Sequence, residues 1–195
     1  MPTKRIDDVR ATVKDLYQTK VAQRADWADW LYINHVIVVA KEAVVLAEKY
    51  TANAELAEAS ALLHDIADAS TKRNDPEHEK KSLDTARNIL TSCGYSADEI
   101  QLIVDDALRF HSCHDSEKPS SLEGKILSTA DAFAHLKTDF YLYATWAFGT
   151  QKSFEDSKQW VLGKIERDFH AKIFFDDERA AWKHDYVLLK ELFSR

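Results

Sequence analysis

The chain has 195 residues, of which 45% are hydrophobic, and it carries a formal net charge of −7. This size fits one domain with a large core, and the negative charge disfavours stable binding to nucleic acid or to an anionic membrane surface. Only 4 glycines and 3 prolines are present, which leaves no glycine-rich phosphate loop and favours helices joined by short connections.

The first 70 residues predict three helices. Residues 4–24 place apolar side chains at helical spacing in an otherwise polar segment. Residues 25–50 contain a β-branched run that could suggest a strand, but the Ala/Glu/Lys-rich continuation favours a buried helix. A third helix is predicted over residues 53–69, with Asn53 as its N-cap and the doublet His64-Asp65 near its C-terminal end.

Two further helices follow a loop at residues 70–76. One is predicted over residues 77–90, and the next over residues 96–111, where Ser96 and Glu99 have the spacing of a capping box.

The last third of the chain also predicts helices only. Ser121 precedes a helical segment that extends to residue 136, and residues 138–195 are helical in pattern and rich in aromatic side chains. The predicted fold class is therefore all-α.

Histidine and aspartate side chains occur on or beside several of these buried segments. They are His35, His64, Asp65, His78, His111 and Asp131. Burying a carboxylate or an imidazole without a partner costs free energy, and one cation can satisfy several such groups on separate helices. Imidazole with carboxylate is a ligand set of Zn, Mn, Fe or Ni, so the pattern predicts a metal-dependent hydrolase.

The order His35, His64-Asp65, Asp131 resembles the HD superfamily of metal-dependent phosphohydrolases, which is named for its His-Asp doublet. The segments LLHDIAD, DPEHEKKSLDTARNIL and SSLEGKILSTADAFAHL are similar to an uncharacterised bacterial branch of that family. The resemblance implies a single all-helical domain, with an HD-domain helical bundle over about residues 27–137 and a C-terminal helical extension over about 138–195.

The resemblance also implies a ligand set. The residues that match the primary metal ligands are His35, His64, Asp65 and Asp131. His78 and His111 fall where members with two metals place their additional imidazoles, and Asp65 would then bridge the ions. One or two divalent ions are expected, from among Mn, Fe, Ni, Co, Zn and Mg, to act as Lewis acid and to activate water.

Residues near the doublet are candidates for the acid–base and phosphate chemistry. Asp65 and Asp68 lie on neighbouring positions of one helical turn, so Asp68 is a candidate general acid or water-orienting residue; the alternative is a helix-end acid that faces solvent. Lys72 and Arg73 follow in a loop, where cations can meet phosphate oxygens. Further candidates for phosphate contact are Arg109 and Lys125.

The remaining histidines fall outside this pattern. His114 is expected to be solvated in a loop, and surface or structural roles are expected for His135, His170 and His184. The C-terminal aromatic side chains are expected to form core or a dimer face rather than to stack on a nucleobase, so a homodimer is possible.

Three functions remain open from the sequence. The leading hypothesis is hydrolysis of a phosphomonoester or phosphodiester by metal-activated water, with a small phosphorylated substrate, most plausibly a nucleotide. The second is an HD-fold diiron oxygenase. The third is a non-catalytic metal- or nucleotide-binding protein.

Two cysteines, Cys93 and Cys113, do not suggest a disulfide framework and indicate a reducing compartment. The N-terminus lacks an apolar signal segment, and there is no run of 18 apolar residues that would span a bilayer. We therefore expect a cytoplasmic protein.

Overall fold

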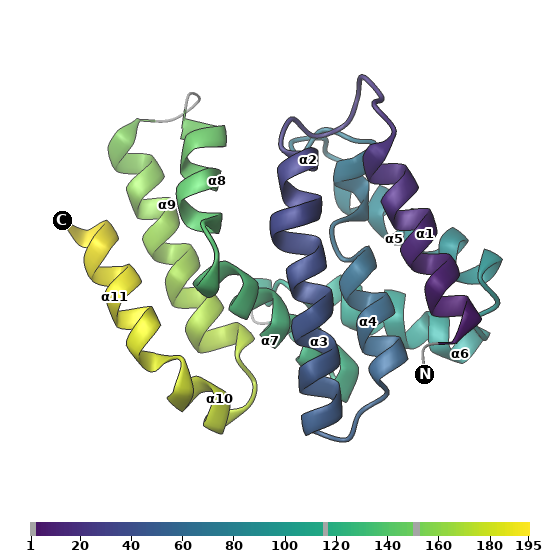
Figure 1. The fold of residues 1–195 in the computed structure, drawn as a ribbon. Helices are drawn as coiled ribbons and strands as arrows, with labels where there is room; N and C mark the ends of the chain where they lie inside the picture. The colour runs from purple at the N-terminus through teal and green to yellow at the C-terminus, as the bar shows by residue number, and fades with distance from the viewer. Residues whose placement is uncertain (1–2, 115–116, 150–152) are drawn as a thin grey trace.

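The structure is a computed structural model that describes residues 3–114, 117–149 and 153–195, and its regular elements there are all helical (Figure 1). The first half of the chain contains α1 (Lys4–Gln18), α2 (Ala28–Leu31), η1 (Tyr32–Val36), α3 (Ile37–Lys49), α4 (Ala54–Leu63), η2 (Ile66–Ala69), α5 (His78–Ser92), α6 (Ala97–Ile100), η3 (Gln101–Leu108) and α7 (Leu122–Lys137). The C-terminal extension contains α8 (Phe140–Gly149), α9 (Phe154–Arg167), η5 (Asp168–Lys172), α10 (Asp176–Ala181) and α11 (Lys183–Ser194). The predicted all-α class is confirmed.

The local signals at helix starts act as the sequence predicts. The Asn53 side chain accepts hydrogen bonds from the backbone N–H groups of Glu55 and Leu56, which satisfies two donors that the first turn of α4 leaves free. Ser96 and Glu99 form a complete capping box at α6. These caps fix where α4 and α6 begin, and so where the helices behind the candidate site point.

The segment with the β-branched run is a continuous helix formed by α2, η1 and α3. Its middle turn, Tyr32–Val36, is π-helical, and such single turns are frequent at functional sites. Within the described residues this one helix, Ala28–Lys49, is long and apolar enough by length and composition to cross a membrane. The core helix of a helical bundle can also be this long and apolar, and this helix packs against α4 and α7. The expectation that the chain has no segment long and apolar enough to span a bilayer is therefore corrected.

The third helix is shorter than predicted. Helix α4 ends at Leu63, and the doublet His64-Asp65 lies in a turn before the short 3₁₀ helix η2. The Tyr17 hydroxyl on α1 donates a hydrogen bond of 2.7 Å to the backbone carbonyl of Asp65 and holds this turn from behind. The break points the two adjacent side chains toward the same region, which a continuous helix would separate by about 100°.

Helix α7 lies between the two halves of the molecule (Figure 1). It packs against α3 and α4 on one side and against α8, η5 and α11 of the extension on the other. Buried Thr129 of α7 joins them: its hydroxyl lies 3.1 Å from the Lys172 carbonyl and accepts a hydrogen bond of 3.1 Å from the backbone N–H of Phe174. The extension is therefore attached directly to the helix that carries Asp131.

Most aromatic side chains of the extension contribute to the core. The stacked pairs are Trp30–Tyr143, Tyr50–Phe175, Phe133–Trp182 and Phe169–Tyr186. Trp146 is 72% exposed, whereas Trp160 lines the cavity described below. The two cysteines are free thiols, as expected.

Candidate metal centre

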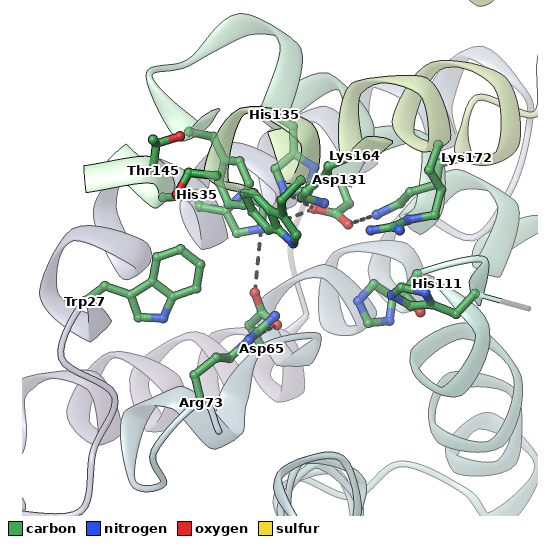
Figure 2. A pocket seen from close by; sticks show the side chains of 17 residues that line it. Trp27, His35, Asp65, Arg73, His111, Asp131, His135, Thr145, Lys164 and Lys172 are labelled. Atoms are coloured by element: carbon green, nitrogen blue, oxygen red, sulfur yellow. Dashed lines mark hydrogen bonds and ion pairs between the residues drawn. The ribbon is translucent and has the colours of Figure 1, made fainter. Parts of the chain in front are cut away.

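Three buried side chains from separate parts of the chain, His35, His64 and Asp131, lie close together. Figure 2 shows two of them, His35 and Asp131. Nε2 of His35, on η1, lies 2.9 Å from Nε2 of His64 and 3.2 Å from Oδ1 of Asp131, on α7. Potential ligand atoms of all three lie within 4.8 Å of one another. Oδ2 of Asp65 adds a fourth group, at 3.7 Å from Nε2 of His35 and 3.5 Å from Nε2 of His64.

The hydrogen bonds around this cluster leave lone pairs directed inward. Nδ1 of His64 lies 2.7 Å from the Ala61 carbonyl, which can only accept, so Nδ1 carries the proton and Nε2 presents a lone pair. Nδ1 of His111 is held in the same way at 2.6 Å from the Leu108 carbonyl. Oδ1 of Asp131 is buried without a hydrogen bond. These features fit a bound divalent cation, which would satisfy the lone pairs together.

Charge and burial put these groups in their metal-binding protonation states. Burial favours a raised pKa for Asp131, but the Lys172 ammonium that pairs with it holds the pKa well below its usual value. For Asp65, burial is likewise outweighed, first by Arg73, and the pKa is again well below its usual value. Burial lowers the pKa of His111 to about 4. The site therefore offers anionic carboxylates and neutral imidazole, the forms that bind metal.

Beside the centre, the partly exposed Arg73 pairs with the fully buried Asp68. Nη1 of Arg73 lies 2.9 Å from Oδ1 of Asp65 and also pairs with Oδ2 of Asp68. Asp68 is fully buried and lines neither of the two cavities described below, so the solvent-facing alternative does not describe it. His78 contacts Oδ1 of Asp68 at 3.3 Å, as does Nε1 of Trp27. His78 thus lies next to Asp68 rather than in the cluster of His35, His64 and Asp131.

Of the other residues that the sequence suggests for the site, some line a cavity beside the cluster and some do not. Lys72 pairs with exposed Asp26 and lines neither cavity, although it is adjacent to Arg73. His111 lies with its ring centroid 5.5 Å from that of His64. Arg109 lines the second cavity, and Lys125 lines neither. The remaining histidines that are exposed are His114, His170 and His184.

Sequence reasoning missed a group of buried polar residues around Asp131. Nε2 of His135 lies 3.2 Å from Oδ1 of Asp131, and its ring is stacked on His35 with centroids 4.8 Å apart. The Lys172 ammonium pairs with Oδ2 of Asp131. The four-residue spacing of Asp131 and His135 on one helix could have indicated this contact. Lys172 comes from the extension, and nothing in its local sequence points to Asp131.

A cavity of about 550 Å³ opens beside the cluster. His35, Asp65, Arg73, His111 and Asp131 are on one part of its wall. The extension contributes further polar lining, which includes Ser157, Trp160, Lys164, Arg167 and Lys172. Trp27 and Phe140 add aromatic surface. An anionic molecule of small-ligand size fits such a site.

A second cavity, of about 540 Å³, adjoins the first because both are lined by Asp65, Arg73 and His111. It lies toward α5 and η3, where His64, His78 and Arg109 contribute to its wall. The candidate centre is therefore accessible from two sides.

The model of the HD domain family matches residues 32–136 of the chain. Two solved structures resemble it: Bacillus subtilis YpgQ in complex with ADP, and a selenomethionine form of YpgQ. Each has a TM-score of 0.70 at 20% sequence identity and covers 98% of this chain, with 92% and 93% of the respective YpgQ chains covered. The shared fold therefore includes the C-terminal extension. No curated protein sequence matches.

Proposed function

The chain belongs to the HD domain family of metal-dependent phosphohydrolases, and on that premise we propose that it hydrolyses a phosphomonoester or phosphodiester of a nucleotide. The observation that carries the proposal is the larger cavity, which is lined both by candidate metal ligands and by basic side chains. Buried His35, Asp65 and Asp131 lie on one part of its wall, and basic side chains lie on another. Such an arrangement suits a phosphate group, which can meet a metal ion and fixed cations at once.

Each part of the cavity has a role in this proposal. A divalent ion held by His35, His64, Asp65 and Asp131 would supply a Lewis acid and lower the pKa of a bound water. Arg73 is held by buried Asp68 and is available to phosphate oxygens from the cavity wall. Asp68 acts on Arg73 rather than on the substrate, because it lines neither cavity.

The nucleotide part of the proposal has two supports. The cavity volume of about 550 Å³ lies within the usual range for small-molecule sites, and Trp27, Phe140 and Trp160 provide aromatic surface for a base. YpgQ, which shares the fold, was crystallised with ADP.

Phosphate release from a panel of nucleotides and small phosphoesters, with Mn, Mg, Co or Ni added in turn, tests the proposal. Chromatography of the products detects a phosphodiesterase, which releases no free phosphate. We expect hydrolysis that requires metal, that is lost in the His64→Ala/Asp65→Ala double variant, and that persists in His170→Ala, because the exposed imidazole of His170 lines neither cavity and pairs with Glu166.

An undiminished rate in the double variant would contradict the proposal, and so would the absence of products with every metal. In the second case, iron content and oxygen uptake would be measured next, because bound iron with oxygen consumption supports the diiron oxygenase alternative.

A further inference from the structure

Asp168, the first residue of η5, lies fully buried at the centre of a polar group that the extension brings to α7. The Tyr141 hydroxyl donates a hydrogen bond of 2.8 Å to Oδ2 of Asp168. Nδ1 of His135 lies 3.0 Å from the same oxygen. Oδ1 of Asp168 lies 3.3 Å from the Lys164 ammonium and 3.9 Å from the Lys172 ammonium.

Two of these neighbours continue to Asp131. Nε2 of His135 lies 3.2 Å from Oδ1 of Asp131, while the Lys172 ammonium pairs with Oδ2. His135 and Lys172 are themselves buried, at 3% and 2% exposure. Figure 2 shows both side chains directed toward Asp131 from different elements. Both oxygens of this carboxylate are therefore contacted by residues that Asp168 touches.

Asp168 also balances charge. Lys164 and Lys172 are two cations close to the candidate centre, and Asp131 and Asp168 are the two carboxylates that pair with them. With Asp168 present, these four charges cancel. Without it, the two lysines would exceed the charge of Asp131 and repel a dication, since electrostatic interactions are strong in a buried region.

We propose that Asp168 is a positioning residue of the metal centre, which holds His135 and Lys172 against Asp131 and offsets the two lysines, so that Asp131 can bind a divalent cation. This inference rests on the metal site of the proposed function. It assigns part of the metal affinity to the extension, outside the residues that the family model matches.

The first test is Mn²⁺ titration of substrate-free Asp168→Asn by calorimetry. Asparagine keeps the shape of the side chain and an acceptor for Tyr141 but removes the charge. Loss of a residue that supports a metal ligand weakens metal binding by roughly 10-fold to 100-fold, and we expect a decrease in that range. Asp177→Asn is the control, because Asp177 is an exposed carboxylate of the same extension that pairs with Lys49. Equal Mn²⁺ affinity of Asp168→Asn and the wild type would overturn the inference.

A second variant separates charge from mere structural damage. In Asp168→Asn/Lys164→Met, one cation is removed with the carboxylate, so Mn²⁺ affinity is expected to return to within a few-fold of the wild type. A double variant that binds Mn²⁺ more weakly than Asp168→Asn would contradict the charge balance. If Asp168→Asn does not fold, Lys164→Met alone provides the test: tighter Mn²⁺ binding supports the inference, and unchanged or weaker binding overturns it.

The same titrations separate this inference from the proposed function. Wild-type protein that binds no Mn²⁺ would overturn both. Wild-type protein that binds Mn²⁺ but hydrolyses no phosphoester would contradict the function alone, and the comparison with Asp168→Asn would still decide the role of Asp168.

Discussion

Nε2 of His35 and Nε2 of His64 face each other at 2.9 Å in the interior of the protein. At this distance two neutral imidazoles can share one proton, and His64 must be the acceptor because its own proton is held at the Ala61 carbonyl. A divalent cation can take the place of that shared proton and receive a lone pair from each ring. Metal binding and a proton are therefore expected to compete for the same position.

Removing one of these rings should abolish stabilisation by metal. For the wild type, a metal at about 100 times its Kd adds about 2.7 kcal/mol to the free energy of unfolding. In a chain of this length that corresponds to a rise in Tm of roughly 5–10 °C. His35→Ala should show no such rise with Mn²⁺, while His170→Ala should match the wild type. Differential scanning calorimetry with and without Mn²⁺ provides the comparison, and an equal rise in His35→Ala would exclude His35 as a ligand.

The metal-free protein should lose stability on acidification at a pH where carboxylates do not yet titrate. Burial lowers the pKa of His111 to about 4 and that of His135 to about 3. In the unfolded chain both return to about 6.5, so between about pH 6.5 and 4.5 the unfolded state binds protons that the folded state does not. Each such histidine then lowers the free energy of unfolding by about 1.4 kcal/mol per pH unit as the pH falls.

Urea denaturation across this pH range measures the slope, and His135→Gln should reduce it by the share of one histidine. A slope that His135→Gln leaves unchanged would show that His135 is already protonated in the folded protein.

Substitutions of the neighbouring residues Lys72 and Arg73 should have effects of very different size. Arg73→Ala leaves the fully buried Asp68 without its guanidinium partner, which should cost about 1–3 kcal/mol of the free energy of unfolding. It should also lower kcat/KM for phosphoester hydrolysis by about 100-fold, the effect of removing one donor to a developing negative charge. Lys72→Ala breaks only a pair with exposed Asp26 and should change stability by less than about 0.5 kcal/mol. Comparable losses of activity in the two variants would place Lys72 in the site after all.

Arg167 should contribute to substrate binding but not to metal binding. It lines the larger cavity, its Nε is buried without a hydrogen bond, and no described carboxylate pairs with it. An anionic substrate group is expected to fill that position, so Arg167→Ala should raise KM about 10-fold, equivalent to about 1.4 kcal/mol. Lys158→Ala removes a charge on the same helix outside both cavities and serves as the control. A fall in Mn²⁺ affinity with unchanged KM would contradict this assignment.

The candidate metal cluster could be predicted from the sequence because polar side chains within apolar helical segments are conspicuous. His35, His64 and Asp131 lie in or beside such segments, and one cation can satisfy them together. The sequence predicts the doublet in a helix, because His64 and Asp65 continue an apolar pattern that carries no local stop signal such as glycine or proline. In the structure the doublet lies in a turn.

Other parts of the site depend on how distant segments pack. Lys172 contacts Asp131, and Asp168 contacts His135, only because η5 lies against α7; neither Asp168 nor Lys172 stands in a sequence pattern that indicates a site. Lys72 and Arg73 are adjacent cations in one loop, and the sequence does not indicate which of them pairs with Asp65. His135 is intermediate, since its spacing from Asp131 shows that the two share a helix face but not that this face is buried at the centre.

The Tyr17 hydroxyl behind the Asp65 turn has a practical consequence. Tyr17 precedes the segment by which the family is recognised, residues 32–136, while Lys172 follows it. A fragment trimmed to those limits would keep every signature residue and lose the supports on either side of them. The segment that identifies the family is thus shorter than the segment that supports the candidate metal centre. A fragment's match to the family would not predict whether it can bind metal.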